Sequence, residues 1–149
     1  MPRAYSVTLD GQSLTAAVTE IITLTAHTNR SCIVTRAWLS QRSNTTSAQQ
    51  AVKIVRQSAS GTSVVTPAIN PLDPDDAAAG FTAKGLCTTL GTDTTVQYSD
   101  SFNWQNGWLW LPVPEERIVV VGAGILTLKL PVAPAALTIS AGLDVIELG

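Results

Sequence analysis

Residues 18–41 read VTEIITLTAHTNRSCIVTRAWLSQ, and this stretch decides the fold class. In its first half, apolar residues at positions 18, 22 and 24 are interleaved with threonines at 19, 23 and 25. This alternation is typical of a half-buried β-strand. Asn29-Arg30 interrupts the pattern, and Ile33 to Gln41 continues it as a longer strand that carries Trp38. The stretch therefore predicts two strands separated by a polar break.

Similar strand-like segments recur along the chain, with turn residues about every ten positions. Tyr5 to Leu9 alternates in the same way, and Leu137 to Leu148 is expected to form a final strand pair around Ala141-Gly142. Residues 48–57 fit a helix or a strand, and the neighbouring strands favour a strand. With 19 Thr and 12 Ser among 149 residues, the composition also favours β structure. We expect an all-β single domain over residues 1–149: a jelly-roll β-sandwich, with an immunoglobulin-like sandwich as the alternative.

Several segments are expected to be irregular. Residues 66–76 hold three prolines and predict a long ordered loop, with one helical turn at residues 75–79. The polar run 42–47 predicts a second loop, and Gly122-Ala123-Gly124 predicts a hairpin loop between two apolar strands. Residues 1–5 are interpreted as an N-terminal arm.

Composition and charge exclude several classes of protein. The formal net charge of −2 argues against a non-specific nucleic-acid binder. No apolar run approaches the roughly 18 residues needed to span a bilayer, so no membrane association is expected. The first residues lack the apolar stretch of a secretory signal. The two cysteines, Cys32 and Cys87, suit neither a metal site nor a disulfide framework, and are interpreted as buried core thiols or as one bridge.

The candidate catalytic and metal-binding residues do not form a convincing site. His27 is the only histidine, and nothing near it in sequence supports a triad. Glu115 and Glu116 are adjacent, so in an extended chain they point to opposite sides. The aspartates at 73, 75 and 76 lack the Gly and Glu of an EF-hand and suit a capped turn better. We expect no enzyme activity, no metal and no cofactor.

Four aromatic residues occupy even positions and would share one face of a strand: Phe102, Trp104, Trp108 and Trp110. Asn106-Gly107 is the expected turn or bulge between the two pairs. Three interpretations are open: core packing, a subunit or partner interface, or a platform on which sugars stack.

Charge is divided unevenly along the chain. Residues 21–72 carry five basic residues and no acid, whereas residues 73–116 carry seven acids and one lysine. Such a division can match a basic face of one subunit to an acidic face of the next. Equally, the fold can interleave the two segments within one molecule.

The last hundred residues resemble small virion proteins encoded near tailed-phage capsid genes. The resemblance covers roughly residues 50–149 and consists of strand and turn patterns: Val52-Lys53-Ile54-Val55-Arg56, Thr66-Pro67, Pro71-Leu72-Asp73-Pro74, Phe102-Asn103, Gly107-Trp108-Leu109-Trp110-Leu111-Pro112, Pro114-Glu115-Glu116-Arg117, Leu126-Thr127-Leu128-Lys129-Leu130, Ala133-Pro134-Ala135-Ala136 and Glu147-Leu148.

The resemblance implies a jelly-roll decoration (cement) protein, made in the bacterial host cytoplasm and located on the outer capsid surface of the virion. Its implied partners are the major capsid protein and itself, as a homotrimer. The competing hypothesis is a ligand- or receptor-binding β module, either a phage fibre or tail component or a carbohydrate-binding domain. The residues expected at interfaces are Pro2, Arg3, Tyr5, Pro71, Asp73, Trp104, Trp108 and Trp110.

Overall fold

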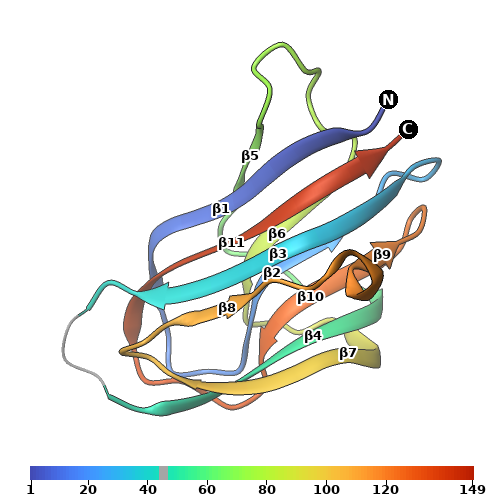
Figure 1. Ribbon diagram of the computed structural model, residues 1–149. Coiled ribbons are helices and arrows are strands. Elements are labelled where there is room, and N and C mark those ends of the chain that lie inside the picture. The colour runs from blue at the N-terminus through green and yellow to red at the C-terminus, as the bar shows by residue number, and fades with distance from the viewer. Residues whose placement is uncertain (44–46) are drawn as a thin grey trace.

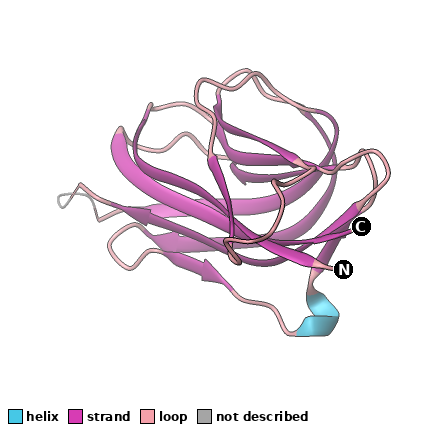
Figure 2. Ribbon diagram, turned by 90° about the horizontal axis from the view of Figure 1, so that it is seen from above, coloured by secondary structure: helices cyan, strands magenta, loops and turns pink. Residues whose placement is uncertain are grey.

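A computed structural model describes residues 1–43 and 47–149, and its architecture is two antiparallel sheets packed face to face (Figure 1). Sheet A contains β1 (Arg3–Leu14), β3 (Ser31–Gln41), β5 (Ala68–Pro71), β8 (Trp108–Trp110), β9 (Ile118–Val120) and β11 (Leu137–Leu148). Sheet B contains β2 (Thr19–Thr25), β4 (Gln49–Ala59), β6 (Thr82–Cys87), β7 (Thr92–Asn103) and β10 (Ile125–Leu130). Among the described residues the helical content is one 3₁₀ turn, η1 (Pro114–Glu116), which Figure 2 shows projecting beyond the strands.

The strand order is that of a jelly roll. Sheet A runs β5-β1-β11-β3-β8, with β9 also paired to β3, and sheet B runs β6-β2-β10-β4-β7. The chain changes sheet at most connections, so that β1 lies beside β11 while β2 lies beside β10. Setting aside the edge strands β5 and β6, and counting β8 and β9 as one interrupted strand, leaves two four-stranded sheets wound around each other. An immunoglobulin-like sandwich would place the first two strands in one sheet, so this alternative is wrong.

The core lies between the sheets and is built by the predicted alternation. In β1, Tyr5, Val7 and Leu9 are buried and alternate with half-buried or exposed neighbours. The same periodicity operates in β3 and β11, because successive side chains of a strand point to opposite faces. In the segment 48–57, residues 49–57 belong to strand β4, as predicted from their neighbours, and Ala48 precedes the strand.

Three local predictions are wrong. Leu137 to Leu148 is one continuous strand with no turn at Ala141-Gly142, because it is paired along both edges, with β1 and β3. Gly122 to Gly124 does not close a hairpin; it carries the chain from β9 in sheet A to β10 in sheet B. Residues 75–79 form no helical turn: Asp75 lies in a turn, Asp76 in a bend, and residues 77–79 have no regular secondary structure. Residues 44–46 of the predicted loop 42–47 lie outside the described residues.

Within the described residues, no helix is long and apolar enough to cross a membrane.

Candidate interaction surface

The predicted N-terminal arm is mostly a strand. Residues 3–5 are the first part of β1 and pair with β11, so of the predicted arm Met1 and Pro2 lie outside the sheet, and both are exposed. Tyr5 is fully buried, and its hydroxyl donates a hydrogen bond to the carbonyl oxygen of Ala77 at 2.9 Å. Its ring meets Phe81 edge to face, with centroids 5.4 Å apart. Tyr5 is therefore a core residue and not a surface contact, because β1 pairs on both sides and turns this ring inward.

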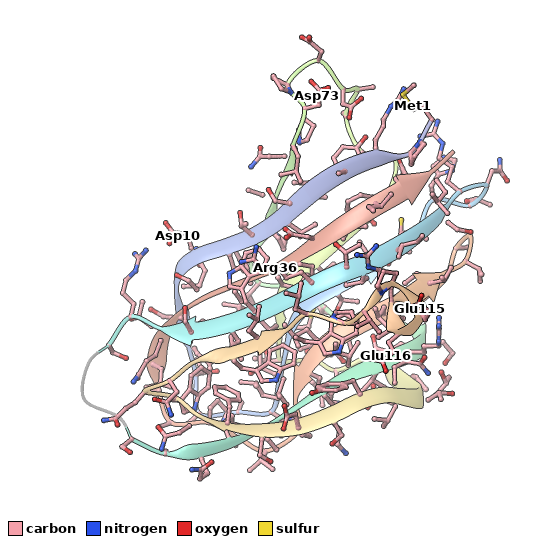
Figure 3. The ribbon with its side chains drawn as sticks, in the orientation of Figure 1. Met1, Asp10, Arg36, Asp73, Glu115 and Glu116 are labelled. Atoms are coloured by element: carbon pink, nitrogen blue, oxygen red, sulfur yellow. The ribbon has the colours of Figure 1, made fainter. Side chains whose placement is uncertain are left out.

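The loop 72–81 connects β5 to β6 and projects beyond the sheets on the side where both ends of the chain lie (Figures 1 and 3). Its first four residues are exposed, and Leu72 exposes 61% of its surface. The N–H of Leu72 donates to the carbonyl of Ala4 at 2.9 Å, and Asp76 forms an ion pair with Arg3 at 3.7 Å. Further along, the N–H of Gly80 donates to Oε1 of Glu147 at 3.0 Å. The loop is thus exposed at its tip and anchored along its length.

Four residues expected at an interface from sequence do come together at this loop. Pro71 lies opposite Tyr5 in the β1–β5 ladder, Arg3 reaches Asp76, and Asp73 is exposed near the tip. The Asp73 carboxylate accepts a hydrogen bond from the N–H of Asp75 at 3.1 Å. The aspartates at 73 and 76 are therefore engaged with backbone and with Arg3, as in the predicted capped turn.

The tryptophans expected at an interface are buried. Trp104 is 1% exposed and packs edge to face on Phe102 at 4.8 Å, while Trp108 and Trp110 are each 7% exposed. Nε1 of Trp108 donates to Oδ2 of Asp100 at 3.3 Å, which satisfies its polar edge. These rings fill the space between the β7 and β8 edges, so the core interpretation is confirmed. A sugar-stacking platform made of these indoles is excluded, since stacking requires an exposed ring face.

A set of exposed apolar residues along β8, β9 and the segment between them was missed by the sequence analysis. In β8 and β9 the inward residues alternate with outward aliphatic residues, which continue through the connecting segment 111–117. We call these five side chains the apolar ridge; they are between 41% and 67% exposed: Leu109, Leu111, Val113, Val119 and Val121. A strand with one solvated face normally carries polar residues at such positions. At residues 108–111 and 118–121 the odd-numbered and the even-numbered positions are all apolar. This pattern was the signal in the sequence that both faces of these strands are apolar.

A second feature missed from sequence lies on the outer face of sheet A. Trp38 is half-buried there, and its indole packs directly on Gly142 of the neighbouring strand. The guanidinium of Arg36 lies 4.6 Å from the Trp38 ring and forms an ion pair with Asp144 at 3.5 Å. Burial raises the pKa of the Asp144 carboxyl above its ordinary value, and the Arg36 charge partly opposes that shift.

A buried polar cluster lies at one end of sheet B. Glu20 is fully buried, and its Oε1 accepts hydrogen bonds from Gln57 at 2.8 Å and from the N–H of Gly91 at 2.6 Å. Gln57 also donates to Asp93 at 2.9 Å, and Lys129 contacts Asp93 at 2.6 Å. Burial alone would raise the pKa of Asp93, but the hydrogen bonds from Gln57 and Lys129 lower it overall. The carboxylates of Glu20 and Asp93 are held by hydrogen bonds within the cluster, although Oε1 of Gln57 has no partner in the described part of the chain, and the cluster is interpreted as a structural network.

The cysteines are free, and both are buried. Cys32 lies in β3 of sheet A and Cys87 in β6 of sheet B, so the single-bridge interpretation is wrong for this conformation. Burial, reinforced by the charge of Glu147, raises the pKa of the Cys32 thiol to about 12. His27 sits in a loop where its Nδ1 accepts a hydrogen bond from the N–H of Asn29 at 3.2 Å. Within residues 1–43 and 47–149, no group of three metal-ligating side chains converges.

The uneven charge distribution is interleaved by the fold. The basic strand β4, with Lys53 and Arg56, pairs along its length with the acidic strand β7, which carries Asp93 and Asp100. The interleaving of the two segments within one molecule is therefore what this strand pair favours.

No protein-family model, curated protein or solved structure gives a significant match to the chain. Two surface features remain for function: the anchored loop 72–81 and the apolar ridge. Both are suited to contact with another protein, because each presents aliphatic side chains on a backbone that is already ordered.

Proposed function

We propose that this chain is a structural protein of a tailed-phage virion. In this proposal it binds the outer surface of the capsid through the major capsid protein, acts as a homotrimer, and stabilises the shell without catalysis. The observation that carries the proposal is the loop 72–81, which is exposed at its tip yet held by contacts to β1 and β11. The jelly-roll fold and the strand and turn patterns of residues 50–149 support the same assignment.

The anchored loop suits a cementing contact for an entropic reason. A flexible segment must be ordered when it binds, at a cost of about 0.5–1.5 kcal/mol for each immobilised side chain. Pro71 and Pro74 restrict the backbone around Leu72, and the contacts to Ala4 and Arg3 fix the loop in advance. Leu72 can therefore enter an apolar site on a partner with little further ordering.

Stabilisation of the shell would follow from mass action. A protein that binds only the assembled capsid favours assembly by about 2.7 kcal/mol per site when its free concentration is a hundredfold above Kd. Repeated over many lattice sites, this effect would raise the resistance of the shell to internal pressure. The competing carbohydrate-binding hypothesis rested on exposed indoles, and the burial of Trp104, Trp108 and Trp110 removes that support.

The test compares capsid binding and rupture for matched variants. Leu72→Ser removes the apolar tip of the loop, and Val132→Ser is the control, because Val132 is 59% exposed outside this loop. We expect Leu72→Ser to bind capsids about tenfold more weakly, as for a central apolar contact, while Val132→Ser binds normally. Particles carrying the protein should rupture at higher temperature or osmotic shock than bare particles. Equal rupture thresholds with the protein shown to be bound would overturn the proposal.

A further inference from the structure

The apolar ridge has the size of the largest apolar patch on a typical monomer, and such patches are often functional. From exposed fractions of 41–67%, its five residues together expose roughly 500 Å², within the usual range of about 300–600 Å². The apolar surface continues from the ridge across sheet A, from its edge strand β9 to β1. Val119 is paired with Ile33, Ile33 with Ile146, and Ile146 with Ala4 in successive strand ladders. Ile33 and Ile146 are half-buried, so this row extends the apolar surface across four strands.

The size of this surface fits one subunit interface. A stable interface buries about 800 Å² on each partner, and about two-thirds of a homodimer interface is apolar. The ridge alone therefore supplies roughly the apolar area that one side of such an interface requires. The remaining area would come from its polar border.

The backbone at the ridge prevents one type of contact. β8 and β9 have three residues each, and the segment between them contains Pro112, Pro114 and η1. Short strands, prolines and an interruption protect a sheet edge from pairing with another chain. A partner must therefore contact the ridge through side chains rather than by adding a strand.

The border of the ridge carries both signs of charge. Glu115 and Glu116 in η1 are exposed, and the described residues place no cation within ion-pair distance of either (Figure 3). Nε of the adjacent Arg117 is buried and has no hydrogen-bond acceptor within the described part of the chain. Arg36 of the neighbouring strand β3 is exposed and forms its ion pair with Asp144 at 3.5 Å. In a cyclic trimer, the acidic group on the border of one copy can face the basic group on the border of the next copy.

We propose that the apolar ridge packs against a second copy of this chain, with the glutamates of η1 in one copy facing Arg36 of the other. This inference rests on the proposed function, which requires the chain to associate with itself. It names the surface through which the copies associate. The loop 72–81 and the ridge would then have separate tasks, capsid contact and subunit contact.

Sedimentation equilibrium of the full chain tests the inference. The test variant is Leu109→Ser with Val119→Ser, and the control is Val96→Ser with Val132→Ser, which are 50% and 59% exposed and lie outside the ridge. We expect the unmodified chain and the control to form a closed oligomer at micromolar concentration. The ridge variant should dissociate at least 100-fold more readily, because each truncated central residue typically weakens binding by about tenfold or more. Circular dichroism of the variant shows whether it keeps its fold.

A second variant tests the border. Glu115→Lys with Glu116→Lys changes exposed residues and keeps the ridge, and we expect about tenfold weaker self-association at low salt that strengthens as salt is added, because salt screens the repulsion between the new lysines and Arg36. A monomeric unmodified chain at 100 µM, or a folded ridge variant that stays oligomeric, would overturn the inference. The proposed function fails separately, if Leu72→Ser remains oligomeric and binds capsids as tightly as the unmodified chain.

Discussion

Replacing Gly142 by alanine should destabilise the protein through Trp38. A Cβ at residue 142 would lie 2.6 Å from Cε2 of Trp38 and closer still to Cζ2 and Cη2. The backbone there is held in register by Thr8 on one side and by Trp38 on the other, so the sheet cannot yield. The indole must therefore leave its place on the sheet and lose its contact with Arg36.

The size of the effect follows from two opposing contributions. Forcing an extra carbon into a packed site costs about 1–3 kcal/mol, and we take about 2 kcal/mol here. Gly142 does not have a positive φ, so alanine can adopt its backbone conformation and stabilises the strand by about 0.5–1 kcal/mol. We expect Gly142→Ala to lower the free energy of unfolding by about 1–1.5 kcal/mol, and Tm by about 2–6 °C.

The sign should reverse when Trp38 is absent. In the Trp38→Ala background the added Cβ meets no ring, so Gly142→Ala should raise the free energy of unfolding by about 0.5–1 kcal/mol. Urea denaturation of the four chains, followed by circular dichroism, gives the coupling free energy directly. Equal destabilisation by Gly142→Ala with and without Trp38 would refute the reasoning.

Three further measurements address the core, the polar cluster and the thiols. Trp104→Ala should lower the free energy of unfolding by about 3–5 kcal/mol in urea denaturation, because it empties a site that is 1% exposed; a loss below about 1 kcal/mol would contradict the core assignment. The lowered pKa of Asp93, held by Gln57 and Lys129, predicts stability that is complete above the ordinary carboxyl pKa of about 3.9 and lost as pH falls through the lower folded value. Asp93→Asn should flatten that part of the pH profile, and an unchanged profile would count against the network. Cys32, with its pKa raised to about 12, should not react with a disulfide reagent at pH 8 until the chain unfolds; rapid labelling of the native chain would show that the thiol is accessible.

Local alternation was sufficient to predict the strands and the all-β class. In β3 buried positions alternate with more exposed ones, and this period is a local property of a strand with one buried face. The half-buried strand predicted around Thr19 to Thr25 is wrong in this respect, because six consecutive residues of β2 are buried and both of its faces are covered. The turn at Asn106-Gly107 was confirmed, with Gly107 at a positive φ of 69°. The single strand face predicted for the four aromatic residues is wrong, because Phe102 lies in β7 of sheet B, Trp104 lies in the turn, and Trp108 and Trp110 lie in β8 of sheet A. The loop of residues 66–76 was predicted in outline from its prolines, because proline excludes a central strand.

Only the tertiary structure decided which faces are covered. In the segments Trp108–Trp110 and Ile118–Val120 both faces are apolar, so periodicity could not distinguish the buried tryptophans from the exposed ridge. Tyr5 was assigned to an arm because its strand partners, β11 and β5, are remote in sequence. Burial depends on which distant segments pack against a residue, and a jelly roll brings its first and last strands together across almost the whole chain. The sequence by itself therefore determined the strands, whereas long-range pairing determined the core, the anchored loop and the ridge.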